Sequence, residues 1–274
     1  MTEERTQPAL WEQQFDVSFD FPPAAVTTKY VICTSPRCGS HHLGHLLHQA
    51  GGFGYPLEYM NAANLRVWAR RAREAGVVAP LAYIKRVRTD RNGVFGIKVH
   101  YSHLHTFLQN EDDVLRYRFI TLERRDLLKQ AVSYSWAAQT KSWISGMPSV
   151  DTAVYDWESI ATKLTEIVRS NAGWRSFLAG AGITPLQLIH EDVRTNPEAA
   201  VDQVAAFLGV TPLRGQPARR FAPAEQKESG KDEWVRQFID DTRQRLGRRE
   251  FPVGGPVRPE TWLAKVPSLF RRFR

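Results

Sequence analysis

The segment Tyr30–Leu43, which reads Y-V-I-C-T-S-P-R-C-G-S-H-H-L, constrains the fold more than any other part of the chain. Its apolar, β-branched opening predicts a strand over 29–34. The chain then turns at Pro36 and Gly39, and apolar residues at helical spacing follow (Leu43, Leu46, Leu47 and Ala50). A strand, a tight turn and a helix N-terminus direct backbone N–H groups and the helix dipole at one point. The segment therefore predicts a phosphate-binding loop.

Two side chains strengthen this interpretation. Arg37 places a cation inside the loop, and Ser40 is a candidate N-cap or hydroxyl donor to the same anion. The loop is not a Walker A motif, because Gly39-Ser40 lacks the lysine and the glycine spacing of G-x-x-x-x-G-K-[ST]. The parts on which nucleotide hydrolysis depends are therefore missing. A purely structural turn that happens to contain an arginine is the alternative.

Strand-like and helix-like segments alternate along the whole chain. Strands are expected at 29–34, 93–99, 117–122 and 185–189, and helices at 40–50, 62–74, 102–108, 127–136, 154–178, 197–208 and 232–246. Such alternation predicts an α/β fold, a P-loop-like three-layer sandwich whose central parallel sheet has helices on both faces. We expect an N-terminal extension at 1–28, one domain at 29–250 and a basic tail at 251–274.

Composition restricts the partners and the compartment. The 274 residues carry a net charge of +8 and a pI of about 9.6, which suits an anionic ligand. Two cysteines do not make a disulfide framework. There is no signal-like N-terminus and no run of ~18 apolar residues. We therefore expect a cytoplasmic protein, with the inner membrane surface as a further location if the tail binds lipid.

A second arginine extends the ligand hypothesis. Arg124 follows the strand expected at 117–122, as Arg37 follows the first strand. Ligands of parallel sheets bind at the carboxyl ends of the strands, so both cations belong to one rim. The pair predicts a ligand with two phosphate-like groups. The alternative for Arg124 is an ion pair with Glu123 or Asp126.

Four segments, in this order along the chain, resemble one enzyme family. They are S-P-R-C-G-S at Ser35–Ser40, L-E-R-R-D-L-L-K-Q-A-V-S-Y at Leu122–Tyr134, I-H-E-D-V-R-T-N-P-E-A-A-V-D-Q-V-A-A-F-L-G-V at Ile189–Val210, and the weaker Q-K-E-S-G-K-D-E-W at Gln226–Trp234. The chain resembles the PAPS-dependent sulfotransferases, most closely the bacterial trehalose 2-sulfotransferase branch. Together the segments are specific, whereas any one alone is weak.

The resemblance implies a donor and the residues that hold it. The donor would be PAPS (3′-phosphoadenosine 5′-phosphosulfate), the product PAP, and no metal would be needed. The 5′-phosphosulfate would lie on the first loop, the 3′-phosphate on Arg124 and Ser133, and a C-terminal loop would close over the donor. The cofactor-binding residues would be Arg37, Cys38, Gly39, Ser40, His41, Arg124, Ser133, Lys227 and Gly230.

The resemblance also nominates a catalytic base. Glu58, in G-F-G-Y-P-L-E-Y, matches the glutamate that would take the proton from an acceptor hydroxyl during in-line attack on sulfur. Arg37 and Lys98 would counter charge on the sulfuryl group, and a salt bridge at the rim is the alternative for Lys98. The acceptor would contact Glu58 and four further residues, Tyr55, His100, Trp136 and Trp143.

Three positions depart from the family pattern. His41 stands where a hydroxyl is usual, Arg125 where proline is common, and Tyr55 where the trehalose enzymes carry an acid. A neutral imidazole or a water would replace the hydroxyl at position 41. The tyrosine argues against trehalose itself, so we expect another carbohydrate, a glycolipid or a related small hydroxyl compound as acceptor.

The histidine clusters and the C-terminal tail are further features of the sequence. The histidines at 41, 45 and 48 include an i, i+4 pair of the kind that can bind zinc, and 100, 103 and 105 form a second cluster, but no acidic partner follows in H-E-x-x-H form and the surroundings are positive, so no metal is expected. The tail 262–274 mixes aromatic and basic residues, which would suit peripheral contact with an anionic membrane. A homodimer stays open. The alternative functions are a nucleotide-dependent small-molecule kinase and a non-catalytic polyanion-binding protein; no nucleic-acid motif is present.

Overall fold

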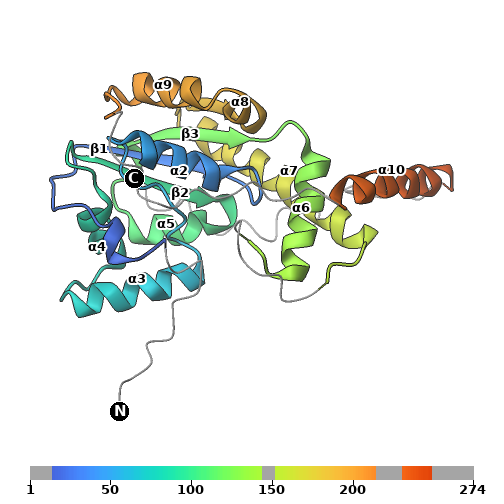
Figure 1. The fold of residues 1–274 in the computed structure, drawn as a ribbon, viewed down its shortest axis with the longest axis horizontal. Coiled ribbons are helices and arrows are strands. Elements are labelled where there is room, and N and C mark those ends of the chain that lie inside the picture. Colours follow the sequence, from blue (N-terminus) through green and yellow to red (C-terminus); the bar gives the residue numbers. More distant parts are fainter. Residues whose placement is uncertain (1–13, 144–151, 214–229, 249–274) are drawn as a thin grey trace, which may run out of the picture.

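A four-stranded parallel sheet forms the centre of the molecule (Figure 1). The computed structural model describes residues 14–143, 152–213 and 230–248. Its strands are β1 (Thr28–Thr34), β2 (Val94–His100), β3 (Tyr117–Glu123) and β4 (Leu186–Ile189), in the spatial order β2-β1-β3-β4. Each expected strand is present within one or two residues, and the predicted parallel α/β architecture is confirmed.

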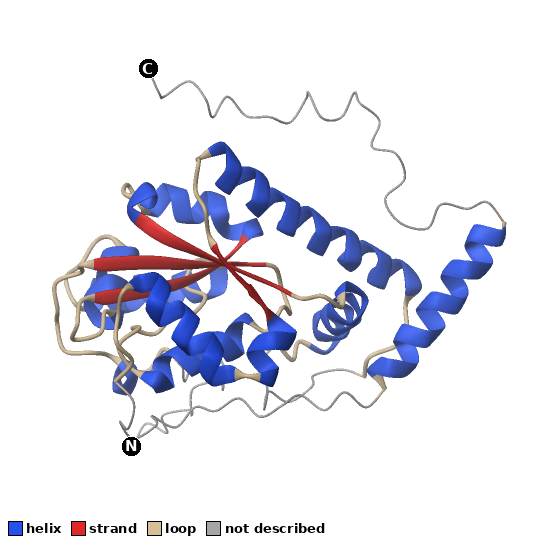
Figure 2. Ribbon diagram, turned by 90° about the horizontal axis from the view of Figure 1, so that it is seen from above, coloured by secondary structure: helices blue, strands red, loops and turns tan. Residues whose placement is uncertain are grey.

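Helices cover both faces of the sheet (Figure 2). Alternate residues of a strand point to opposite faces, so Val31 and Cys33 belong to one core and Tyr30 and Ile32 to another. The first core includes α3 (Ala62–Glu74), α4 (Pro80–Arg88), α5 (Leu104–Asn110) and α7 (Trp157–Gly180). The second is closed by α2 (Ser40–Ala50) and α9 (Pro197–Leu208).

A third apolar cluster lies beside the sheet. It joins α6 (Leu127–Thr140) to α7 and to α10 (Lys231–Gly247), and Trp157 stacks on Phe238 with ring centroids 5.4 Å apart. The remaining helical elements are short: α8 (His190–Thr195) and the 3-10 turns η1 (Val17–Phe19), η2 (Tyr101–His103) and η3 (Val114–Arg116). Within the described ranges, no helix has the length and apolar character that a membrane span requires.

Local chemistry explains where the expected helices differ from the observed ones. The helix expected from residue 154 begins at Trp157, because the Asp156 carboxylate caps it by accepting from the Ser159 N–H at 3.0 Å. Helix α4 was not predicted from the sequence. It is short, and Ala79 before it offers no capping side chain, so only Pro80 at its first turn marks its start.

The described part of the predicted N-terminal extension packs into the domain. Phe15 and Phe19 lie in the first core with exposed fractions of 2% and 8%. The Asp20 carboxylate lies 2.5 Å from Arg71 and 3.3 Å from the fully buried guanidinium of Arg88. The expected boundary at 28/29 therefore does not separate two structural units.

Strand order brings the candidate site together. Because β1 lies between β2 and β3, the loops that follow these three strands leave the sheet side by side. Thr34 and His100 are register partners at the carboxyl ends of β1 and β2. Ligands of parallel sheets bind where neighbouring connections diverge, and this edge is such a place.

Candidate active site

The loop after β1 has a backbone that most side chains would not allow. Arg37 has φ 63° and Gly39 has φ 83°, both in the left-handed region. A Cβ on Gly39 would lie 2.0 Å from Nδ1 of His190. Gly39, rather than Ser40, is the N-cap of α2, and Ser40 is the first helical residue. The expected strand, tight turn and helix N-terminus are thus present, with the orphan N–H groups of a first turn beside Arg37.

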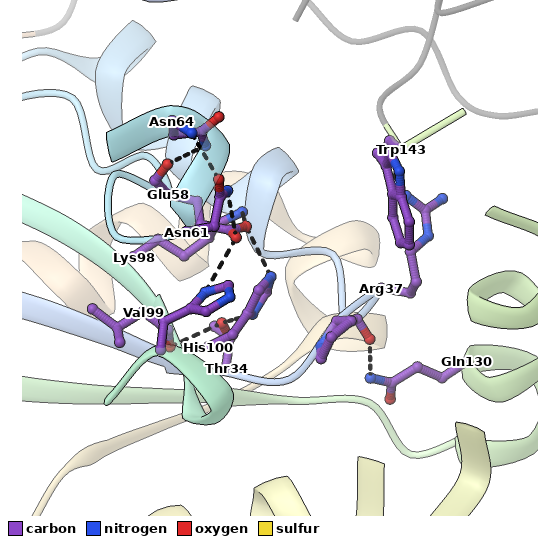
Figure 3. Close-up of polar contacts among 12 residues, drawn as sticks. Thr34, Arg37, Glu58, Asn61, Asn64, Lys98, Val99, His100, Gln130 and Trp143 are labelled. Carbon is purple, nitrogen blue, oxygen red and sulfur yellow. Dashed lines mark hydrogen bonds and ion pairs between the residues drawn. The ribbon is translucent and has the colours of Figure 1, made fainter. Parts of the chain in front are cut away.

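Helix α6 holds this loop in place. The side-chain amide of Gln130, which is fully buried, donates to Ser35 Oγ at 3.0 Å and to the Pro36 carbonyl at 2.7 Å (Figure 3). No sequence signal singled out Gln130, although it lies inside the quoted segment Leu122–Tyr134. Two hydrogen bonds from one side chain fix the turn from which Arg37 projects.

Arg37 is directed by α6 and the residues that follow it. Its Nε donates to Ser133 Oγ at 3.2 Å and its Nη1 to the Trp143 carbonyl. Burial, and next the charge of Arg124, lower the pKa of Arg37 to about 10. The two guanidinium groups on neighbouring strand ends are therefore close enough to repel each other. An anion between or beside them would relieve that repulsion.

Glu123 and Asp126, the two carboxylates expected as alternative ion-pair partners of Arg124, both bind other groups. Glu123 binds Arg175 at 3.1 and 2.6 Å, and Asp126 caps α6 by accepting from a backbone N–H. Arg124 instead lies 3.8 Å from the Glu191 carboxylate, an ion-pair distance too long for a hydrogen bond. Among the described residues, its buried Nε has no hydrogen-bond partner.

Two histidines border the loop with buried ring nitrogens. Nε2 of His41 and Nδ1 of His190 have no hydrogen-bond partner within the described part of the chain. Burial, then Lys98 and other neighbouring cations, hold the pKa of His41 well below its usual range. Burial and Arg124 lower the pKa of His190. Both rings are therefore neutral at pH 7, as expected for His41. The sequence did not single out His190, although it opens the quoted I-H-E-D segment.

These buried nitrogens test whether the site fits an anionic cofactor. Three buried nitrogens near the N-terminus of α2 have no hydrogen-bond partner among the residues described. They belong to Arg124, His41 and His190, and all three are able to donate. A phosphate-bearing group suits this set of donors.

Glu58 is surrounded by nitrogen donors (Figure 3). Its Oε2 lies 2.9 Å from His100 Nε2 and 3.1 Å from Lys98 Nζ. Its Oε1 accepts from Asn61 Nδ2 at 2.9 Å and lies 3.4 Å from His103 Nδ1. Burial favours the neutral acid, but His100, Lys98 and the hydrogen bonds outweigh it and hold the pKa of Glu58 well below its ordinary value. The carboxylate is ionised at neutral pH.

Main-chain contacts place Glu58 beside β2. It forms an isolated parallel bridge with Lys98, whose N–H donates to the Leu57 carbonyl at 3.0 Å. The loop reaches this position by passing close to α2, where a Cβ on Gly44 would lie 2.6 Å from the Pro56 carbonyl oxygen. Lys98 lies near the carboxyl end of β2, as expected. It also forms an ion pair with the proposed base, and such a salt bridge is the alternative role given for Lys98 from the sequence.

The predicted acceptor residues separate into different environments. Tyr55 has no exposed surface: its hydroxyl contacts His45 Nδ1 at 3.1 Å and its ring stacks on His48 at 3.9 Å. In this conformation its side chain packs in the first core. Trp136 packs on Trp234 with centroids 4.8 Å apart, in the α6–α7–α10 cluster.

A different aromatic pair lies next to Arg37. Trp143 is 41% exposed and meets Tyr134 edge-on, with ring centroids 6.1 Å apart. Burial, then Glu166 and, to the least extent, Glu58, raise the pKa of Tyr134 to about 12. Tyr134 therefore lies within electrostatic range of Glu58. The sequence marked Trp143 but not Tyr134.

The remaining residues predicted to bind the sulfuryl donor lie in the loop after β1, at the start of α2, at the start of α10, or outside the described residues. Cys38, in the loop, and Ser40, at the start of α2, are both buried. Gly230 is the N-cap of α10, and a Cβ added to it would lie 3.5 Å from the Trp136 ring. Lys227 lies outside the described residues, as does the tail 251–274. No group of three or more metal-ligating side chains occurs within the ranges described above.

Comparison with known proteins identifies a family over most of the chain. Residues 29–241 match the family model described as Stf0 sulphotransferase. A trehalose 2-sulfotransferase of Mycobacterium tuberculosis is 27% identical over 76% of this chain and 93% of its own length. The trehalose 2-sulfotransferase of Mycolicibacterium smegmatis is 24% identical over 79% of this chain and 96% of its own length.

Solved structures give weaker matches. A sulfotransferase from Alicyclobacillus acidocaldarius aligns with a TM-score of 0.45 and 14% identity, over 83% of this chain and 98% of its own. The sulfotransferase domain from the curacin biosynthetic pathway aligns with a TM-score of 0.43 and 16% identity, over 71% of this chain and 77% of its own.

Proposed function

Because the chain belongs to the Stf0 sulphotransferase family, we propose that it transfers a sulfuryl group from PAPS to a hydroxyl of a carbohydrate or glycolipid acceptor. The observation that carries this proposal is the meeting of Arg37, Arg124 and Glu58 at one edge of the sheet. Two cations suit a donor with two separated phosphates, and an ionised carboxylate suits proton removal from the acceptor.

The proposed donor contacts follow from the groups around the loop. The N-terminus of α2, Arg37 and His41 would hold the 5′-phosphosulfate, and Arg124 the 3′-phosphate. Ser133 already accepts from Arg37 Nε at 3.2 Å, so it either orients that guanidinium or turns to the phosphate. When bound, the donor supplies an activated sulfuryl group and a stabilised leaving phosphate; backbone N–H groups and guanidinium groups stabilise that charge without reorganising.

Glu58 is proposed as the general base. An ionised carboxylate takes the acceptor's hydroxyl proton as the oxygen attacks sulfur in line with the leaving phosphate. Lys98, held 3.1 Å from Oε2, supplies a positive charge next to the same reaction centre. Its ion pair with Glu58 keeps the carboxylate in the proton-accepting form while the acceptor binds.

A carbohydrate acceptor is supported by the relatives and by the aromatic pair at the site. Two curated relatives bear the name trehalose 2-sulfotransferase. Tyr134 and the partly exposed ring of Trp143, next to Arg37, offer an apolar edge with a hydroxyl, a combination that suits the mixed apolar and polar faces of a sugar. Which sugar, and which of its hydroxyls, is best found by a labelled-donor screen across glycosides and glycolipids.

Ligand-dependent thermal unfolding tests the donor. Adenosine 3′,5′-bisphosphate should raise Tm more than AMP, and ATP with Mg²⁺ should not exceed it. A larger shift with ATP and Mg²⁺ would instead indicate a kinase. Equal Tm shifts with adenosine 3′,5′-bisphosphate and with AMP, both falling steeply as the salt concentration rises, would indicate a general polyanion binder.

The base is tested with Glu58→Gln. This variant should keep its affinity for adenosine 3′,5′-bisphosphate and lose at least ~100-fold in turnover, because the amide cannot accept the proton. Asn61→Ala removes one hydrogen bond to Oε1 and the side-chain cap of α3 but leaves the carboxylate, so as the matched control it should lose much less turnover. Near-normal turnover of Glu58→Gln would remove Glu58 from the mechanism.

A further inference from the structure

Three side chains form a hydrogen-bonded line behind the proposed base (Figure 3). Oε2 of Glu58 lies 2.9 Å from Nε2 of His100, and Nδ1 of His100 lies 2.7 Å from Oγ1 of Thr34. The Thr34 hydroxyl also lies 3.2 Å from the Val99 carbonyl oxygen. Both nitrogens of the imidazole are therefore engaged inside the protein.

The line is built on rigid elements. Thr34 and His100 are register partners at the ends of β1 and β2, with exposed fractions of 1% and 8%. The indole N–H of Trp174, on α7, donates to the Thr34 carbonyl at 3.0 Å. A ring fixed between two paired strands cannot turn toward an acceptor, which separates His100 from the more exposed His103.

Thr34 determines which imidazole nitrogen carries the proton. In the neutral ring, the Thr34 hydroxyl donates to Nδ1, so the N–H is at Nε2 and points to Glu58. In the charged ring, Nδ1–H donates to Oγ1 and the hydroxyl turns to the Val99 carbonyl, and Nε2–H still points to Glu58. The remaining neutral tautomer would place a bare nitrogen lone pair against a carboxylate oxygen, which is electrostatically unfavourable.

Other groups also face Glu58. Lys98 and His103 contact its two oxygens, His41 on α2 and Tyr134 on α6 lie within electrostatic range, and Asn61 donates to Oε1. The ammonium group of Lys98 contributes a charge with three rotating donors, whereas His100 contributes a single donor of fixed direction. The imidazole therefore sets the orientation of the carboxylate as well as part of its electrostatics.

From this geometry we infer that His100, locked by Thr34, is the positioning residue that presents an N–H to Glu58 and keeps its carboxylate ionised and aligned for the acceptor hydroxyl. This inference rests on the proposed role of Glu58 as the base. It selects one histidine from the 100, 103 and 105 cluster, and it adds Thr34, which nothing in the sequence marked.

The pH dependence of kcat tests the inference. In His100→Ala the acid limb should move up by about one to two pH units, because a hydrogen bond to a charged group is lost. His100→Gln, whose amide nitrogen can reach the position of Nε2, should recover much of the shift. Thr34→Val should also move the acid limb to higher pH, by less than His100→Ala does. Thr34→Ser, which keeps the hydroxyl, should leave the acid limb near its wild-type position. Damage to the fold alone would lower kcat at every pH without moving the limb.

A second readout needs no donor. The ¹³C carboxyl resonance of Glu58, assigned by its absence in Glu58→Gln, should titrate at higher pH in His100→Ala than in the wild type. If Glu58 titrates at the same pH in His100→Ala as in the wild type, and the acid limbs of kcat also coincide, the role of His100 is overturned. If Glu58→Gln is inactive at the same time, the role of Glu58 as the base stands. An active Glu58→Gln would overturn the base instead, so the two failures are distinguishable.

Discussion

Nζ of Lys98 lies 3.1 Å from Oε2 of Glu58, and the same two residues form a parallel bridge through their main chains. A cation at a strand end and a carboxylate from a separate loop are thus joined by two interactions, a side-chain ion pair and a main-chain bridge. The charge that would stabilise the sulfuryl group in the proposed reaction and the group that would accept the proton form one unit. Substitutions in this unit and in the donor loop should therefore have separable effects on turnover and on nucleotide binding.

Lys98→Met should lower kcat by roughly 100-fold and change the affinity for adenosine 3′,5′-bisphosphate by less than about threefold, since that product carries no sulfuryl group. Steady-state rates and calorimetric binding check both numbers. Lys29→Met, on β1 at the opposite end of the sheet and paired with Glu111 at 3.6 Å, is the control and should keep its turnover when folded. Equal losses in kcat and in product affinity would assign Lys98 to the phosphates.

Arg124→Gln should reduce the preference for adenosine 3′,5′-bisphosphate over AMP by about 10- to 100-fold, as expected for losing a charge-assisted hydrogen bond. Calorimetry with both nucleotides measures this preference. The neighbouring Arg125→Gln removes an exposed guanidinium that binds Asp192 at 2.5 Å and should leave the preference unchanged. If the two variants behave alike, Arg124 does not read the 3′-phosphate.

Gly39→Ala should destabilise the chain by about 1–3 kcal/mol and weaken bisphosphate binding, because the new methyl group meets the His190 ring at a φ of 83°. Denaturant unfolding gives the free energy. Gly180→Ala, in α7 with open space around its Cβ, should instead gain up to about 1 kcal/mol. A neutral Gly39→Ala would mean that the loop can move away from His190.

Glu111→Gln should remove part of the acid sensitivity of folding. Glu111 contacts Lys85 and accepts from the Tyr117 hydroxyl at 2.6 Å. Burial opposes its ionisation, but these contacts prevail and lower its pKa below the usual 4.5. A depressed carboxylate pKa adds stability that is complete above pH 4.5 and is lost as pH falls through the folded value.

Above pH 4.5 the variant should therefore be less stable than the wild type by about 1–3 kcal/mol, and the difference should shrink in more acidic solution. Denaturant titrations at a series of pH values measure it. Asp112→Asn, at the exposed neighbouring acid, is the matched surface control. A difference that stays constant down to about pH 2–3 would indicate a packing effect alone.

The architecture followed from the sequence because local signals agreed with one another. The apolar runs at Val31 and Ile97 alternate with helical segments, and both helices 62–74 and 197–208 have the predicted bounds. Helix α4 escaped prediction because nine residues without a capping side chain give a weak local signal. The burial of Phe15 and Phe19 depends on contacts with distant helices, which no local pattern contains.

The candidate site was predictable only at its strand ends. Loops after parallel strands gather at one edge, so the proximity of Arg37 and Arg124 follows from topology. The pairing of Glu58 with Lys98 and His100 depends on where a glycine-rich loop passes beside β2, and spacing along the chain does not encode that. The burial of Tyr55, three positions from Glu58, is likewise not encoded in local spacing.

The ion pair between Asp20 and the buried guanidinium of Arg88 has a practical consequence for trimming the gene. A fragment designed to begin at the first strand would leave that guanidinium without its carboxylate and would empty the space filled by Phe15. Expression clones for crystallography or ligand screening therefore need to start upstream of residue 14, even though the family match begins at residue 29.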